Sequence, residues 1–138
     1  MSEPFFTQRF PAQAEQLHQL REWVRDFLLE HGLDASRVDQ VVIGVNEAAM
    51  NIIEHAYCHQ SGDIILKIHY QQTAFIIELI DFAQTVDCSK IKSRCLDDIR
   101  PGGLGVHFIQ EMIDKVEYLP GDSGAGNIIR MTVNINPR

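Results

Sequence analysis

The chain has 138 residues, of which 45% are hydrophobic and 22% are charged, so its composition is that of a globular domain rather than a disordered segment. This length suits one domain, residues 1–138, with a single core. The formal net charge of −7 argues against direct binding to nucleic acid, because an acidic surface repels phosphate backbones and the basic residues form no patch.

No stretch of the sequence approaches the roughly 18 apolar residues of a membrane-spanning helix, and the N-terminus lacks the layout of a signal peptide. The cysteines, Cys58, Cys88 and Cys95, are an odd number without paired spacing, which favours reduced thiols. We therefore expect a cytoplasmic protein that does not contact a membrane.

The first elements predicted along the chain are a strand and a helix. Apolar and polar residues alternate over 5–10, as in a short strand. Over 12–30 the apolar positions recur at helical spacing, and His31-Gly32 then supplies a stop signal. Phe5, Phe6 and Phe10 could form the surface of a homodimer through this strand and helix, or they could equally belong to the core.

A second helix is predicted from Ser36 to about Tyr57, with Ser36 and Asp39 as a variant of the capping box. Its apolar positions recur at helical spacing and predict one buried stripe. The stripe consists of Val38, Val41, Val42, Val45, Ala49, Ile52 and Ala56.

The same helix carries a polar face. Glu47, Asn51 and His55 are spaced by four residues and should lie nearly one above another. The small residues Gly44 and Ala48 flank them and would leave room for a ligand against the helix. By periodicity alone this face could equally be a polar surface that meets water.

Beyond this helix the hydrophobic period becomes strand-like. Residues 64–69 and 75–81, joined by a turn at 71–73, predict a β-hairpin. Segment 82–101 has only weak periodicity, and long irregular segments inside compact domains are often functional lids. A third helix from the glycine run at 102–105 and strands at 116–119 and 127–135 complete the chain. We expect an α+β fold, a two-layer sandwich with helices on one face of a mostly antiparallel mixed sheet.

Two further features could carry chemistry. Asp81 ends an apolar strand, where a carboxylate can accept a hydrogen bond from a ligand amine or can simply begin a turn. The run Gly102-Gly103-Leu104-Gly105 opens the third helix, where backbone N–H groups can hold phosphate, although a flexible loop would have the same composition. Together with the polar helix face they suggest one nucleotide pocket, in which an asparagine oxygen ligates Mg²⁺.

Residues 46–57, Asn-Glu-Ala-Ala-Met-Asn-Ile-Ile-Glu-His-Ala-Tyr, resemble the N box of the anti-sigma-factor serine/threonine kinases. These kinases belong to the wider GHKL group of ATPases, which share the Bergerat-type ATP-binding fold. Asp81 lies where the first glycine box of that family begins, and 103–106 resembles its second glycine box. The order of the boxes and the lid between them also agree, so the resemblance runs from about Phe5 to Ile135.

The resemblance implies a role for each matching residue. Glu47 would be the general base for a substrate hydroxyl, Asn51 would hold Mg²⁺, and Asp81 would accept a hydrogen bond from the adenine amino group. His55 would lie at the pocket wall. The backbone amides that hold the phosphates would come from Gly102, Gly103, Leu104, Gly105 and Val106.

The implied activity is transfer of the γ-phosphate of Mg-ATP to a serine or threonine of an anti-anti-sigma protein of the STAS type, with a sigma factor as a second partner. One departure favours an alternative. The family's first glycine box begins Asp-x-Gly, whereas this chain has Asp81-Phe82-Ala83. If Ala83 must take a positive φ, its methyl group costs roughly 1 kcal/mol. The alternative is therefore a non-catalytic protein-binding anti-sigma module with weakened or lost nucleotide binding.

A fragment of a histidine kinase is a third interpretation. It is disfavoured because no phosphoacceptor helix hairpin precedes the domain, and we expect these 138 residues to be the whole protein.

Overall fold

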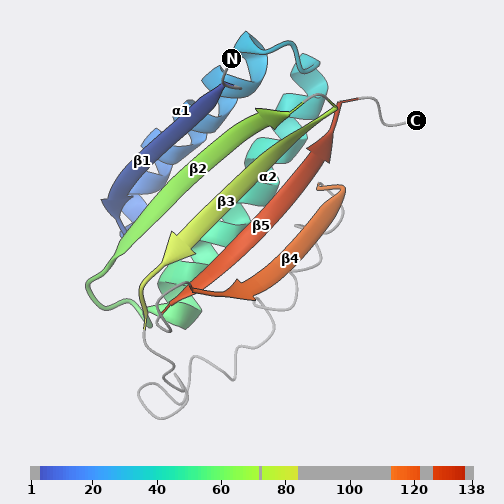
Figure 1. The fold of residues 1–138 in the computed structure, drawn as a ribbon. Helices are drawn as coiled ribbons and strands as arrows, with labels where there is room; N and C mark the ends of the chain where they lie inside the picture. The colour runs from blue at the N-terminus through green and yellow to red at the C-terminus, as the bar shows by residue number, and fades with distance from the viewer. Residues whose placement is uncertain (1–3, 72, 84–112, 122–125, 136–138) are drawn as a thin grey trace.

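The computed structural model describes residues 4–71, 73–83, 113–121 and 126–135. In this part of the chain five strands form a sheet in the order β1-β2-β3-β5-β4, and each neighbouring pair is antiparallel. Both α-helices lie on the same face of the sheet (Figure 1). The predicted α+β sandwich is thus confirmed. The strands are β1 (Phe5–Pro11), β2 (Asp63–Gln71), β3 (Ala74–Asp81), β4 (Lys115–Pro120) and β5 (Asn127–Asn134); the helices are α1 (Leu17–Glu30) and α2 (Ala35–Asn51).

The core lies between the sheet and the helices, and α2 supplies its centre. Every residue of the predicted stripe is buried except Ala56, which is partly exposed. Valine disfavours a helix by up to about 0.7 kcal/mol relative to alanine, whereas full burial of its side chain stabilises by roughly 1.5–3 kcal/mol. Packing against the sheet therefore outweighs intrinsic propensity along α2.

The β2–β3 hairpin faces this core with alternate residues, as predicted. Ile64, Leu66 and Ile68 of β2 are fully buried, and the residues between them are only partly buried. Strand β1 adds Phe10, which packs against Trp23 of α1, as does Phe6. Of the three phenylalanines proposed for a dimer, two thus belong to the core or its edge, and Phe5 is 49% exposed.

The N-terminus of α2 differs from the prediction. Asp34 is the N-cap, and its carboxylate accepts hydrogen bonds from the N–H groups of Ser36 and Arg37 at 3.1 and 3.4 Å. Ser36 is already helical, and its hydroxyl donates to the same carboxylate at 2.6 Å. The predicted cap at Ser36 was wrong because an aspartate two positions earlier reaches the same free N–H groups.

The C-terminal end of α2 continues into a π-helical turn, Ile52–Ala56. Here the N–H of Tyr57 donates to the carbonyl of Ile52, five residues earlier, at 2.9 Å. Cys58 and His59 follow with φ of 52° and 63°, which ends the helix near the predicted position. Cys58 is disulfide-bonded, contrary to the expected reduced thiol; Cys88 and Cys95 lie outside the described residues.

Within the described residues, no helix combines the length and the hydropathy needed to cross a membrane.

Candidate functional site

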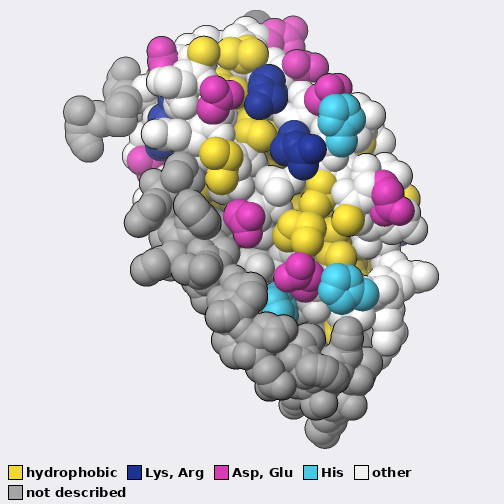
Figure 2. All heavy atoms as spheres, turned by 180° about the vertical axis from the view of Figure 1, so that it is seen from behind, with side chains coloured by type: hydrophobic (Ala, Val, Ile, Leu, Met, Phe, Trp, Pro, Cys, Tyr) yellow, Lys and Arg dark blue, Asp and Glu magenta, His cyan; other side chains and the backbone are white. Residues whose placement is uncertain are grey.

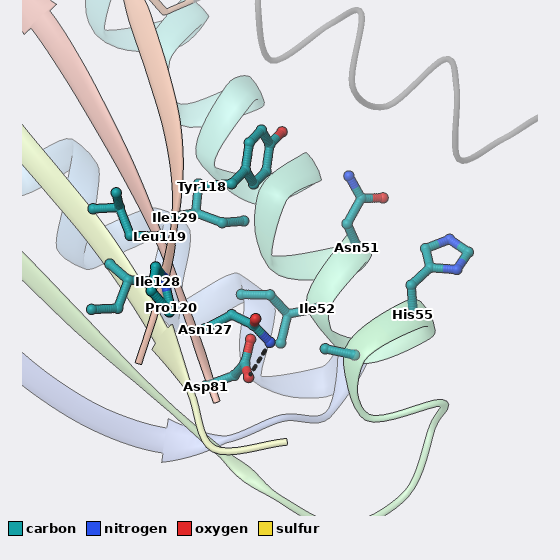
Figure 3. A pocket seen from close by; sticks show the side chains of 11 residues that line it. Asn51, Ile52, His55, Asp81, Tyr118, Leu119, Pro120, Asn127, Ile128 and Ile129 are labelled. Atoms are coloured by element: carbon teal, nitrogen blue, oxygen red, sulfur yellow. Dashed lines mark hydrogen bonds between the residues drawn. The ribbon is translucent and has the colours of Figure 1, made fainter. Parts of the chain in front are cut away.

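A cavity of about 500 Å³ lies between the end of α2 and the ends of β3, β4 and β5 (Figure 3). It brings together three residues that the sequence predicted, Asn51, His55 and Asp81. Asn51 and His55 stand on the helix side, and Asp81 stands on the strand side. The wall between them is mostly apolar and includes Ile52 and Ile129. Pockets of this size and character are typical of small-molecule and cofactor sites.

Asp81 is the charged group most completely withdrawn from water in the described chain, with 2% of its surface exposed. Its Oδ1 accepts a hydrogen bond from the backbone N–H of Ala83 at 3.1 Å and another from the side-chain amide of Asn127 at 3.3 Å. Burial raises the pKa of this carboxyl, and the bonds from Ala83 and Asn127 oppose that rise. A buried acceptor at the wall of an apolar cavity suits a ligand that presents a hydrogen-bond donor.

The register of the sheet holds Asp81 in place. Asp81 is the strand partner of Asn127, so β5 presents its first side chain to the carboxylate. Gly126 precedes Asn127 with a φ of +86°, and a Cβ there would collide with the Asp81 carbonyl and lie 2.9 Å from Cα of Phe82. Only glycine fits this close approach. The sequence analysis assigned no role to Gly126 or Asn127, because neither residue belongs to a motif.

Tyr57 connects three segments beside the cavity. Its hydroxyl donates to the carbonyl of Asp63 at 2.6 Å and accepts from the N–H of Phe82 at 2.7 Å. Gly62 lies so close to the tyrosine ring that a Cβ there would overlap it. Burial is the main reason that the pKa of Tyr57 is raised. The side chain thereby ties the end of the N-box segment to the start of β2 and to the chain leaving β3.

The helix side of the cavity departs from regular helical spacing. Asn51 is the last residue of α2, and His55 lies inside the π-helical turn. That turn contains more residues than an α-helical turn, yet Asn51 and His55 project from the same side of the segment (Figure 3). Both side chains are nevertheless half-buried and line the cavity.

Glu47 lies one helical turn before Asn51 and lines a different hollow, of about 400 Å³, between α1 and α2. Arg21, Arg25 and Asn46 also line it, and Arg21 donates to the Asn46 side chain at 3.0 Å. This hollow belongs to the helix face of the molecule, where hydrophobic, acidic and basic side chains are mixed (Figure 2). The structure thus does not place Glu47 in the lining of the cavity that holds Asp81.

The small residues beside the polar face were predicted to leave room for a ligand, but they do not. Gly44 and Ala48 are buried in the helix–sheet packing. The room beside Asn51 comes instead from the separation between the end of α2 and the ends of the strands.

The residues expected to hold phosphates, Gly102 to Val106, lie outside the described residues, as do residues 84–101 of the predicted lid. Ala83 is described, and its backbone bears on the departure from Asp-x-Gly. The described non-glycine residues with a positive φ are Cys58 and His59. Ala83 therefore has no left-handed conformation to strain its methyl group, and its N–H bonds Asp81 as a glycine N–H could.

Comparison with known proteins identifies the family of the chain. Residues 10–133 match the model of the histidine kinase-like ATPase domain. The chain is 28% identical over 130 residues to the serine-protein kinase RsbW of Halalkalibacterium halodurans, covering 88% of this chain and 78% of that protein. It is 27% identical over 124 residues to RsbW of Staphylococcus aureus, covering 83% and 78%. The chain therefore belongs to the histidine kinase-like ATPase domain family, and within it resembles the anti-sigma-factor serine kinases.

Proposed function

We propose that this protein is an ATP-dependent serine/threonine kinase of the anti-sigma-factor type. The observation that carries the proposal is the buried carboxylate of Asp81 at the wall of a cavity whose opposite side holds Asn51. The apolar lining fits a purine base, and the carboxylate fits its exocyclic amine. The family match and the similarity to serine-protein kinases support the same assignment.

The proposed roles follow from the chemistry of each group. Asp81 accepts the hydrogen bond of the adenine amine, and the amide oxygen of Asn51 is a suitable ligand for Mg²⁺. The backbone amides of Gly102 to Val106 hold the phosphates, with His55 at the pocket wall. ATP, when bound, supplies the phosphoryl group. Catalysis is then mostly positioning and charge neutralisation.

Glu47 is the proposed general base. As the acceptor hydroxyl oxygen forms its bond to the γ-phosphorus, the bond from phosphorus to the ADP oxygen breaks, and Glu47 takes the hydroxyl proton. Four residues of helix separate Glu47 from Asn51 by about 6 Å along the axis. The base would thus approach from the hollow between α1 and α2, on the side from which a protein substrate can reach it.

The proposed substrate is a serine or threonine of a small anti-anti-sigma protein of the STAS type, in a cytoplasmic partner-switching system with a sigma factor as the competing partner. The relatives are named serine-protein kinases, and that name supports phosphoryl transfer to a protein serine as the reaction class. The partners themselves rest on the resemblance of the N box and the glycine boxes.

A second candidate is a protein-binding anti-sigma module that has lost nucleotide binding. One observation favours it: Glu47 lies outside the lining of the Asp81 cavity. This module would use the same helix face to hold its partner without chemistry.

Calorimetric titration with ATP and Mg²⁺, repeated with EDTA, separates the two candidates. The kinase predicts magnesium-dependent binding that Asp81→Asn weakens by at least about tenfold, because a hydrogen bond to a charged group contributes roughly 1.5–3 kcal/mol. Asp26→Asn, an exposed change on α1, is the matched control and should bind like the wild type. Absence of binding at millimolar nucleotide would rule out the kinase and favour the protein-binding anti-sigma module.

Phosphotransfer then tests the base. Glu47→Gln keeps the size of the side chain but cannot accept the proton, so it should keep nucleotide affinity within about threefold and slow transfer to a genuine partner by at least about 100-fold. Unchanged transfer would show that Glu47 is not the base.

A further inference from the structure

Asn127, to which the proposed function assigns no role, stands beside Asp81 in the wall of the cavity. It is the first residue of β5 and the strand partner of Asp81, so the two side chains leave the sheet on the same face. Asn127 is exposed, whereas Asp81 has only 2% of its surface exposed. Figure 3 shows the two side chains joined on the strand side of the cavity. A ligand that reaches the carboxylate therefore also meets the amide of Asn127.

Asp81 determines which end of the Asn127 amide faces it. Nδ2 of Asn127 donates to Oδ1 of Asp81 at 3.3 Å. An ionised carboxylate only accepts hydrogen bonds, so turning the amide over would place its oxygen against an oxygen of Asp81. Nδ2 carries two hydrogens, and the bond to Asp81 uses one of them. The pair thus presents an acceptor and a donor side by side, in a fixed order.

Adenine carries the complementary order on one edge of its ring system. Its 6-amino group donates, and the neighbouring ring nitrogen N1 accepts. Guanine has the reverse order, with an accepting O6 beside a donating N1–H. Against the pair formed by Asp81 and Asn127, guanine would bring acceptor to acceptor and donor to donor, and unpaired polar groups of this kind are what a selective site uses to reject a competitor.

We infer that Asn127 is the residue that selects adenine over guanine, by donating its second Nδ2 hydrogen to N1 of the base while Asp81 accepts from the 6-amino group. The inference rests on the proposed function, because it requires ATP to bind in this cavity. The amine, the carboxylate, the amide nitrogen and N1 then form a closed ring of hydrogen bonds. Each polar atom on that edge of the base is paired in a site whose other walls are mostly apolar.

A purely supporting role for Asn127 has different consequences. If the amide only oriented Asp81, its loss would weaken the bond to the 6-amino group, and N1 of the base would make no difference. Two observations favour direct contact. Asn127 itself lines the cavity, and Asp81 is also held by the backbone N–H of Ala83 at 3.1 Å, so the carboxylate does not depend on the amide alone.

Calorimetric titration with ATP and with 1-deaza-ATP, both with Mg²⁺, tests the contact. 1-Deaza-ATP has a C–H group in place of N1 and keeps the 6-amino group. It should bind the wild type at least about fivefold more weakly than ATP, because the Nδ2 hydrogen loses its acceptor. Asn127→Leu keeps the approximate size of the side chain without its polar groups, so it should bind the two nucleotides within about twofold of each other. Asn134→Leu, the same change at the other end of β5, should keep the preference of the wild type.

The outcomes separate this inference from the proposed function. Equal affinities of ATP and 1-deaza-ATP for the wild type would overturn the contact with N1 and leave the proposed function standing. A preference for ATP that persists in a folded Asn127→Leu variant would assign N1 to another group and would also overturn the inference. A wild type that binds neither nucleotide would remove the proposed function and this inference together. Thermal unfolding shows whether each variant is folded, and Asn127→Ala, which removes the same amide, replaces Asn127→Leu if that variant is not.

Discussion

At the scale of single residues, the burial of Asp81 affects stability and ligand binding in opposite directions. Folding removes the carboxylate from water, and burial raises its pKa above the usual aspartate value of 3.8. Its hydrogen-bond donors, Ala83 and Asn127, are neutral groups, so they compensate only in part. The same burial leaves an acceptor aimed at the cavity. Binding and stability therefore place opposite demands on this side chain.

Asp81→Asn should separate these demands. Because its pKa is raised on folding, the Asp81 carboxyl contributes stability that is fully present below the ordinary value and is lost as pH rises through the raised one. The amide does not ionise, so the variant should be more stable than the wild type at pH 7, and this advantage should shrink as pH falls toward 3.8. Urea unfolding at several pH values measures the difference. An advantage that grows on acidification would contradict the raised pKa.

Ala83→Gly restores the Asp-x-Gly order of the resembled family. Since Ala83 has no positive φ and its N–H already bonds Asp81, the change should alter nucleotide affinity by less than about fivefold and stability by less than about 1 kcal/mol. Calorimetry and urea unfolding measure the two effects. A gain in affinity of about a hundredfold would show instead that the alanine methyl obstructs the ligand.

At the scale of elements, the long periodic segments were predictable and the junctions were not. The valine stripe of α2 and the alternation of β2 and β3 identify their own buried faces, because burial must follow the period of each element. The cap at Asp34 and the π-helical turn depend on local competition between hydrogen bonds, which periodicity does not report. Glu47 was assigned by motif, yet its hollow is defined by the packing of α1, which no motif records.

Two glycines with similar backbones test how closely β5 approaches the end of β3. Gly126→Ala should destabilise by at least about 2 kcal/mol, because it adds a collision with the Asp81 carbonyl to the cost of a positive φ. Gly32→Ala has a φ of +93° with no atom within 4 Å of the added Cβ, so it should cost only about 1 kcal/mol. Denaturant titration of both variants gives the free-energy cost of the collision as the difference between their losses of stability. Equal losses of stability would rule the collision out.

At the scale of the whole molecule, the candidate site joins the two layers of the sandwich. One wall comes from α2 and its π-helical turn, and the other comes from the ends of three strands. The sequence suggested that Asn51 and Asp81 belong to one nucleotide pocket, and both line one cavity in the structure. The walls of that cavity depend on the antiparallel order β3-β5-β4, which a single sequence pattern does not specify.

A ligand held between two layers should resist their separation. Mg-ATP at a concentration of 100 times its dissociation constant should stabilise the folded state by about 2.7 kcal/mol, which corresponds to several degrees in Tm for a domain of this size. Differential scanning fluorimetry across a nucleotide series measures the shift. The Asp81→Asn variant, which should bind at least about tenfold more weakly, should show at most about half of this shift at the same concentration, and an equal shift in both proteins would place the nucleotide elsewhere.

The π-helical turn Ile52–Ala56 has a consequence for the length of the chain. Relative to an uninterrupted α-helix, it accommodates one extra residue within the N-box segment. Deleting one residue from the turn should therefore let the segment close as a regular α-helix with the later residues nearly in place, whereas inserting a further residue would rotate each later side chain by about 100°. The insertion would move Tyr57 away from the carbonyl of Asp63 and the N–H of Phe82. The segment between Asn51 and Tyr57 should thus tolerate the loss of one residue better than the gain of one.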